Sequence, residues 1–189
     1  TESRPQFTRG LSPNLPALVQ LSTRLGAFLF SLRHLTGEAE ARLLALLSNS
    51  AVLKAGVNID HDVAGLVRRY PALAPAGFVK LEQLAKLADC RERGLETLAK
   101  TLLGLQLGKH MHVKISDWEA WPLSPEQIAY AGTDAWVGCM LAVKLLSTLS
   151  LTVAQLRERN PGHALTVALR SSEPVAAPKS TTASLATAS

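Results

Sequence analysis

The sequence predicts an α/β fold in which helices pack on a mixed sheet. Two short apolar runs, 17–23 and 26–32, flank the turn-like "RLG" and are typical of an antiparallel hairpin. Further along, strand-like and helix-like segments alternate, beginning with the apolar run 51–59 and the amphipathic stretch after it. Strands that pair early, followed by alternating strands and helices, favour a mixed sheet flanked by helices.

Length, charge and cysteine content limit the class of protein. The 189 residues suffice for one compact domain with a tail. The net charge of +5 suits a polyanionic partner without requiring one. No apolar run reaches the roughly 18 residues of a membrane span, and the N-terminus lacks the apolar centre of a secretory signal, so we expect an intracellular protein with no membrane partner. Cys90 and Cys139 have neither metal-ligand nor disulfide-framework spacing.

The first half of the chain contains the hairpin, two helices and a further strand. Both runs of the hairpin are predicted to be buried strands. A helix is predicted over 36–50, where Thr36 is the candidate N-cap and leucines recur at helical spacing. The strand predicted at 51–59 leads into a second helix, for which Asp60 is the candidate N-cap.

The second half begins with shorter elements. Residues 78–88 start like a strand and continue as a helix, and 94–104 form a short amphipathic helix that Gly104 closes. The connection 105–123 is basic, aromatic and rich in turn residues, and no strand or helix period persists in it. We therefore expect a long loop there.

A long helix follows the loop. Ser124 is its predicted N-cap, Pro125 occupies the first helical position, and Gln127 completes a capping box. The apolar pattern continues to about Leu149. Beyond it we expect a C-terminal extension over 150–170 and, from its Ser, Thr, Ala and Pro composition, a disordered tail over 171–189.

In such a fold, catalytic and binding residues lie near the ends of strands, and few acidic residues of this sequence occupy such positions. Asp62 lies in the first turn of the second predicted helix, and Glu2 precedes the first predicted strand. Asp134 projects from the long helix, and Tyr130 stands one turn before it, so the two share a face. The residues around this pair are small, which would let a ligand or another element approach closely.

Three segments, taken in order, carry a family resemblance: "KAGVNIDHDVAGL", "LETLAKTLLG" and "SDWEAWPLSPEQIAYAGTDAW". Together they resemble the DEDDy 3′-5′ exonucleases, especially the exonuclease domain of the Werner-syndrome helicase and its plant and ribonuclease D-like relatives. The resemblance covers residues 1–149, which we take as the exonuclease domain. It implies a ribonuclease H-like fold and hydrolysis of phosphodiester bonds at DNA or RNA 3′ ends.

The resemblance also implies a set of site residues. The family pattern combines DxE, an aspartate just after a GVxIxxD stretch, and YxxxD; the second falls on Asp62 and the third on Tyr130 and Asp134. The first falls on Glu2. The carboxylates would bind two Mg²⁺ or Mn²⁺ ions about 3.5–4 Å apart, because hard cations prefer oxygen ligands. Tyr130 would orient the attacking water.

One part of the pattern is absent from the sequence. The aspartate of DxE would precede Thr1, and so would the strand that carries it, which the fold places inside the sheet. We therefore expect an N-terminally truncated domain, a fragment that is weakly active or inactive, whose neighbouring strands have lost a backbone partner. Each missing carboxylate removes negative charge that would neutralise the metal ions.

The loop offers further candidates. The resemblance favours Lys109 and Lys114 as nucleic-acid-binding residues that contact phosphates. The pair His110 and His112 lacks further ligands of its own, so we do not favour a metal site there. Tryptophans 118 and 121 could stack on bases, but we favour the interpretation that they anchor the loop against the last helix.

Other interpretations stay open. Without the resemblance, Asp62 would be a helix-terminal acid favoured by the helix dipole, Tyr130 a residue at the core edge and Asp134 a surface charge. The whole chain could accordingly be a catalytically dead domain that binds nucleic acid or protein, or a helical interaction scaffold. The resemblance leads us to expect a nuclear location, with an organellar one as the alternative, and a helicase domain or partner in the parent protein.

Overall fold

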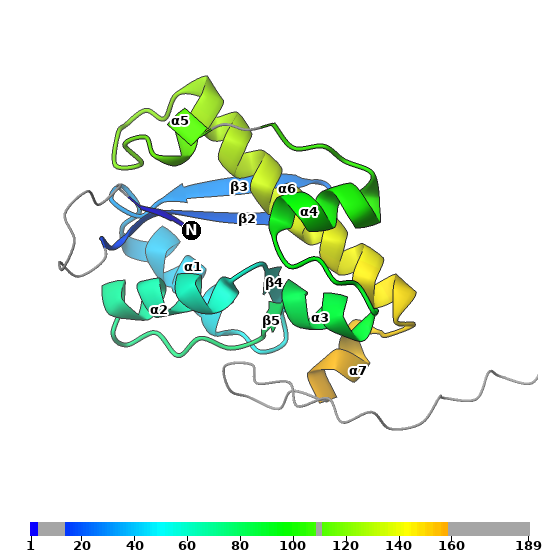
Figure 1. Ribbon diagram of the computed structural model, residues 1–189. Coiled ribbons are helices and arrows are strands. Elements are labelled where there is room, and N and C mark those ends of the chain that lie inside the picture. Colours follow the sequence, from blue (N-terminus) through cyan, green and yellow to red (C-terminus); the bar gives the residue numbers. More distant parts are fainter. Residues whose placement is uncertain (4–13, 109–110, 159–189) are drawn as a thin grey trace, which may run out of the picture.

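A computed structural model of the chain describes residues 1–3, 14–108 and 111–158 (Figure 1). It confirms the predicted α/β class, with strands flanked by helices. The tail predicted over 171–189 and most of the extension predicted over 150–170 lie outside the described residues. None of the helices in the described ranges is both long and apolar enough to cross a bilayer.

The strands form two separate sheets. In the first, the order is β1 (Glu2–Ser3), β2 (Pro16–Thr23) and β3 (Gly26–Ser31), all antiparallel, which confirms the predicted hairpin. The second consists of β4 (Lys54–Gly56) and β5 (Phe78–Lys80) in parallel. Both kinds of pairing that a mixed sheet combines are therefore present, and within the described residues no strand connects the two sheets.

Three strands differ from their predictions. The strand predicted at 51–59 is shorter, because a turn in which the Val52 amide donates to the Asn49 carbonyl precedes it and Asn58, at φ 54°, ends it. Strand β3 is not buried, since it lies at the edge of its sheet and Phe28 is 56% exposed. Only the first half of β2 is fully buried.

The first two helices follow the predicted positions with one change of cap. Thr36 is the N-cap of α1 (Gly37–Ser48), although its side chain makes no capping hydrogen bond. The N-cap of α2 (Ile59–Arg69) is Asn58 and not Asp60, which lies inside the first turn. The physical reason is the left-handed backbone of Asn58, which turns the chain from β4 straight into the helix; Asp60 instead pairs with Lys80.

The remaining helices are short apart from one. In chain order they are α3 (Leu81–Leu87), α4 (Leu95–Leu98), the π-helix η1 (Ala99–Leu103), α5 (Met111–Lys114), α6 (Pro125–Thr148) and α7 (Val153–Glu158). Gly104 closes η1 at φ 69°, as predicted for the end of this segment. The one turn of α5 interrupts the region predicted as a loop.

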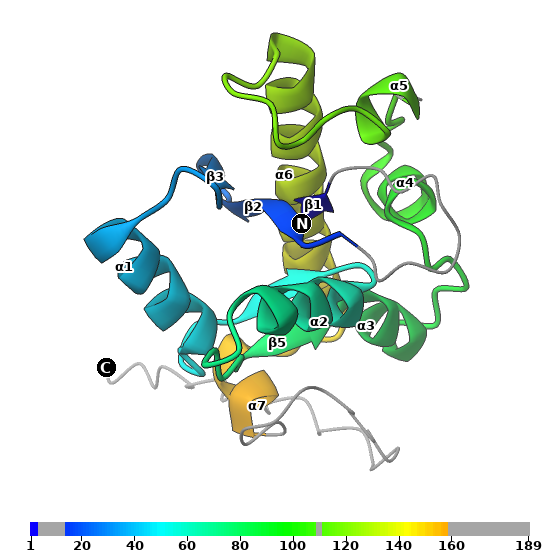
Figure 2. The same ribbon diagram turned by 90° about the vertical axis from the view of Figure 1, so that its left-hand side faces the viewer.

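Helix α6 contacts both sheets and so joins the two halves of the fold (Figures 1 and 2). Ser124 accepts the Gln127 amide and the Gln127 side chain accepts the Ser124 amide, which confirms the predicted capping box. Because side chains alternate along a strand, Leu18 of β2 packs in the cluster that includes α6, whereas Val19 packs in the cluster built from α1 and α2.

Candidate active site

Glu2 enters the structure on β1, where it pairs with Leu18 of β2. The Gln20 amide Nε2 lies 3.4 Å from Glu2 Oε1 and donates to it. Burial raises the pKa of the Glu2 carboxyl to about 7; the Thr1 ammonium opposes the rise, and the negative charges of Asp134 and Asp62 add to it. Glu2 is therefore a half-buried acid within electrostatic reach of two further carboxylates.

Asp62 faces the N-terminal residues from the first turn of α2. The Thr1 hydroxyl donates to Asp62 Oδ1 over 2.8 Å, and the Thr1 amino nitrogen lies 3.3 Å from the same oxygen. The side chain of Asp62 is 30% exposed, so one side of it remains open to solvent. The turn that begins α2 is held in place by Glu82, which accepts the Asn58 amide.

Tyr130 and Asp134 lie one turn apart on α6, as the spacing predicts. Burial raises the pKa of the Tyr130 hydroxyl above its ordinary value, and the charges of Asp134 and Glu2 and a hydrogen bond with Asp134 raise it further. At neutral pH the side chain is therefore a phenol that can donate its proton to a neighbouring oxygen. The same interactions place Glu2 near this pair.

Small side chains and one hydrogen bond bring α6 close to the first sheet. Ala131 is fully buried, and a Cβ added at Gly132 would lie 3.8 Å from Ala27 Cβ of β3. The Ser22 hydroxyl on β2 donates to the Ala135 carbonyl over 2.6 Å. This contact ties the turn of α6 that carries Asp134 to β2.

The structure thus gathers the four predicted residues from three elements: Glu2 from β1, Asp62 from α2, and Tyr130 and Asp134 from α6. They do not form a closed metal cage. Within the described parts of the chain, no three histidine, cysteine, aspartate or glutamate side chains lie close enough together to hold one ion.

The loop candidates are only partly within the described residues. Lys109 and His110 fall outside the described residues. Lys114 is exposed on α5, and His112 Nε2 lies 3.2 Å from Glu126 Oε2, with both side chains largely in solvent. The two tryptophans differ. Trp118 is buried with its ring beside Tyr130 of α6, which confirms the predicted anchoring, whereas Trp121 is 62% exposed and its ring lies 4.8 Å from that of His34.

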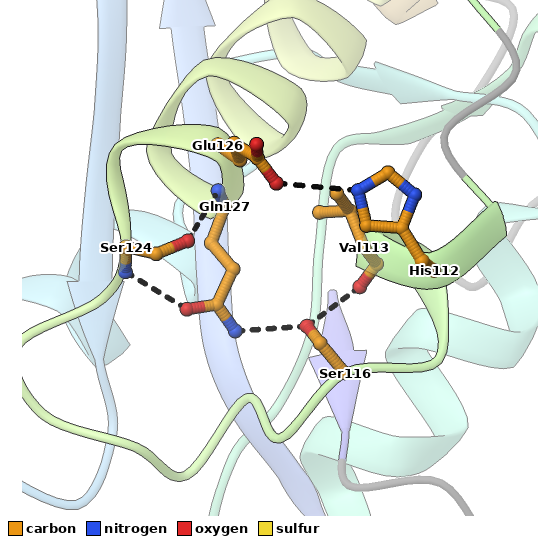
Figure 3. Close-up of polar contacts among 6 residues, drawn as sticks. All are labelled: His112, Val113, Ser116, Ser124, Glu126 and Gln127. Atoms are coloured by element: carbon orange, nitrogen blue, oxygen red, sulfur yellow. Dashed lines mark hydrogen bonds and ion pairs between the residues drawn. The ribbon is translucent and has the colours of Figure 1, made fainter.

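A hydrogen-bond network that the sequence did not indicate ties the loop to α6 (Figure 3). Gln127 closes the capping box with its Oε1, while its Nε2 donates to Ser116 Oγ over 2.9 Å and to the Asp117 carbonyl over 3.0 Å. The Ser116 hydroxyl in turn donates to the Val113 carbonyl at 2.6 Å. Part of this role could be predicted from the sequence, because Gln127 lies on the same helix face as Tyr130 and Asp134, at positions i, i+3 and i+7.

Comparisons with known proteins point to one family. A family model described as a 3′-5′ exonuclease matches residues 6–150. The chain is 35% identical over 144 residues to exonuclease 3′-5′ domain-containing protein 2 of Drosophila melanogaster, covering 76% of this chain and 24% of that protein. It is 37% identical over 111 residues to the bifunctional 3′-5′ exonuclease/ATP-dependent helicase WRN of Mus musculus, covering 54% of this chain and 7% of that protein. The chain therefore spans a quarter or less of these relatives.

Solved structures show the same fold. Escherichia coli RNase D superimposes with a TM-score of 0.63 at 22% identity, covering 79% of this chain and 38% of that one. Brucella melitensis NrnC with bound Mg²⁺ superimposes with a TM-score of 0.58 at 23% identity, covering 71% of this chain and 64% of that one. At these identities the match concerns the arrangement of the backbone.

Proposed function

Because this chain belongs to the 3′-5′ exonuclease family, we propose that it hydrolyses phosphodiester bonds at the 3′ ends of DNA or RNA with the cluster around Glu2. The observation that carries the proposal is the meeting of Glu2, Asp62, Tyr130 and Asp134 from three separate elements. These residues are the ones that match the family pattern in order. Support for a catalytic domain over 1–149 comes from the match over 6–150.

The donor atoms suit divalent metal ions. Glu2, Asp62 and Asp134 offer only carboxylate oxygens, and the charges of the two aspartates raise the pKa of Glu2. A carboxylate group of this kind favours a hard cation such as Mg²⁺ or Mn²⁺, which would compensate the repulsion. We propose that these three residues hold two such ions. When bound, the ions would supply an activated water and charge stabilisation for the leaving oxygen.

Tyr130 would act on the attacking water. With its pKa raised by burial, Asp134 and Glu2, the hydroxyl keeps its proton at neutral pH and does not serve as a general base. It can donate one hydrogen bond and accept another, which is enough to orient a water molecule beside Asp134. Tyr130 is thus proposed as an orienting group.

Substrate binding would rest on positive charge near the start of α6. Lys114 is exposed on α5, and Lys109 precedes the same helix in sequence. We propose that both contact substrate phosphates, because such contacts come mainly from Lys and Arg and carry no sequence information. The net charge of +5 is consistent with a polyanionic ligand.

A polypeptide of these 189 residues is proposed to be weakly active. It contains three of the four carboxylates of the family pattern, and no three ligands lie together for one ion in the described ranges. Each 1.36 kcal/mol lost from the transition state lowers the rate about tenfold. The lack of three converging ligands in the described ranges also favours a second candidate function, a catalytically dead domain that binds nucleic acid.

The setting of the domain is also a proposal. One similar protein is named as a combined exonuclease and helicase. We propose that this chain works beside a helicase domain or partner on nuclear nucleic acid, with an organelle as the alternative location.

The test is shortening of oligonucleotides labelled at the 5′ end, with Mn²⁺ or Mg²⁺. The chain is assayed as given and with an aspartate-bearing strand added before Thr1. We expect slow, metal-dependent removal of 3′ nucleotides that the added aspartate accelerates and that Asp134→Asn abolishes. Glu126→Gln on the same helix is the matched control and should retain activity. Binding of the oligonucleotide without any shortening, even with the added aspartate, would reject hydrolysis in favour of the binding domain.

A further inference from the structure

We propose that Trp118 is a positioning residue for Tyr130 and that Gln127 holds Trp118 in place. The importance of this contact for hydrolysis rests on the proposed function, in which Tyr130 orients water. The contact itself is a property of the fold and can be tested separately. Its parts come from the loop before α6 and from the first turns of α6.

Trp118 is buried beside Tyr130. Its side chain is 1% exposed and its ring centroid lies 6.0 Å from that of Tyr130, with the rings tilted by 42°. The geometry is within the range of favourable aromatic pairs. The indole Nε1 donates to the Lys114 carbonyl over 3.3 Å, so the ring is held at its polar edge as well. One wall of the Tyr130 ring is therefore a fixed aromatic surface.

Gln127 fixes the backbone on which Trp118 stands. Its side chain is 6% exposed and makes two donor contacts, to Ser116 Oγ and to the carbonyl of Asp117, the residue directly before Trp118. Because these donors are buried, moving the loop would leave them without partners. Figure 3 shows the bond between Gln127 and Ser116 that ties the loop to α6. The loop segment therefore has one favoured position relative to α6.

Tyr130 is thereby held from two sides. Gln127 and the loop lie one turn before it on the helix, and Asp134 lies one turn after it and hydrogen-bonds with its hydroxyl. Trp118 sets the direction of the ring, whereas Asp134 sets the direction of the hydroxyl proton. A shift of the ring would displace the hydroxyl, because the oxygen stands at the far end of the rigid side chain.

Trp121 offers a matched control in the same loop. It is 62% exposed and its ring lies 4.8 Å from that of His34, on the side of β3. Replacing it removes an indole from the same loop without removing the ring that contacts Tyr130. Ser124 is the matched control for Gln127, because Ser124→Ala removes one capping bond and leaves the two Gln127 Nε2 bonds in place.

The experiment is ¹⁹F NMR of the chain labelled with 3-fluorotyrosine. The chain contains only two tyrosines, Tyr70 and Tyr130, so two resonances are expected and Tyr130→Phe assigns them. We expect Trp118→Leu to shift or broaden the Tyr130 resonance and leave that of Tyr70 unchanged. Trp118→Phe should largely restore the signal, and Trp121→Leu should not move it.

Loss of a buried tryptophan can unfold a protein, so Gln127→Met provides a second test that keeps the indole. It should also move the Tyr130 resonance, whereas Ser124→Ala should not. An unmoved Tyr130 resonance in a folded Trp118→Leu or Gln127→Met protein would overturn the proposal, and so would equal shifts in the two control variants.

The NMR result is independent of nuclease activity. If no shortening of oligonucleotides occurs, the proposed function fails while the contact can still be present; if Tyr130 does not respond to Trp118, the positioning role fails while hydrolysis can still occur. Where hydrolysis is measured, Trp118→Leu should lower kcat without raising KM and should add nothing to Tyr130→Phe. A rise in KM alone would contradict the positioning role.

Discussion

One side chain on a strand, that of Lys54, caps the end of a helix in this protein. Lys54 on β4 is 8% exposed, and its Nζ donates to the Asn49 carbonyl over 2.8 Å and to the Leu46 carbonyl over 3.3 Å, both at the end of α1. Helix α1 has no basic residue in its last turn. Lys54 therefore supplies the positive charge that a helix C-terminus favours.

Lys54 leads to a prediction about pH. Burial lowers its pKa in the folded protein to about 8, whereas the unfolded value is about 10.4. Between these values the unfolded chain binds more protons than the folded one, so the free energy of unfolding rises as the pH increases from about 8 to about 10. The gain is at most about 3 kcal/mol by linkage. Urea denaturation at several pH values measures it.

Lys54→Met is the control for this prediction. The substitution removes the titrating group, so the rise between pH 8 and 10 should shrink or vanish. Since two carbonyls lose a donor, the variant should also be less stable at high pH by about 1–2 kcal/mol. A wild-type chain whose stability falls throughout this window would contradict the assignment of Lys54 as a buried amine.

At the scale of elements, helix α6 depends on small residues for its distance from the first sheet. At Gly132, an added Cβ would make only an ordinary contact of 3.8 Å with Ala27. Gly132→Ala should therefore stabilise the protein by about 0.5–1 kcal/mol, because alanine favours the helix interior. Gly132→Leu should destabilise it by about 1–3 kcal/mol, because the larger side chain forces α6 away from β3.

Thermal unfolding followed by circular dichroism checks the pair of variants. Gly138→Ala is the control, since no atom outside the helix's own backbone lies within 4 Å of its added Cβ and the propensity gain should appear alone. If Gly132→Ala destabilised the protein as much as Gly132→Leu, α6 would lie closer to β3 than the 3.8 Å contact with Ala27 indicates.

The elements also show which features a sequence can predict. The capping box of Ser124 and Gln127 was predictable because both partners lie within four residues. The N-cap of α2 was not, because Asn58 adopts φ 54° and its amide is held by Glu82, 24 positions away. The edge position of β3, which leaves Phe28 exposed, likewise depends on which strands pair and not on local composition.

At the scale of the whole molecule, the candidate site depends on contacts between distant parts of the chain. The pattern of Tyr130 and Asp134 on one helix face follows from local spacing. Their meeting with Glu2, and the bond from Thr1 to Asp62 across 61 positions, follow only from the fold. The family pattern indicated these residues, whereas the role of Gln127 depends on the packing of the loop against α6.

The central claim is that Glu2, Asp62 and Asp134 form one site for divalent cations. Calorimetric titration with Mn²⁺ tests it most directly on wild type, Asp62→Asn, Asp134→Asn and the control Asp60→Asn. Asp60 lies two residues before Asp62, and its side chain pairs with Lys80. We predict that either substitution in the site weakens Mn²⁺ binding by about tenfold or more, while the control leaves it unchanged. Equal Mn²⁺ affinity in all four proteins would contradict the claim.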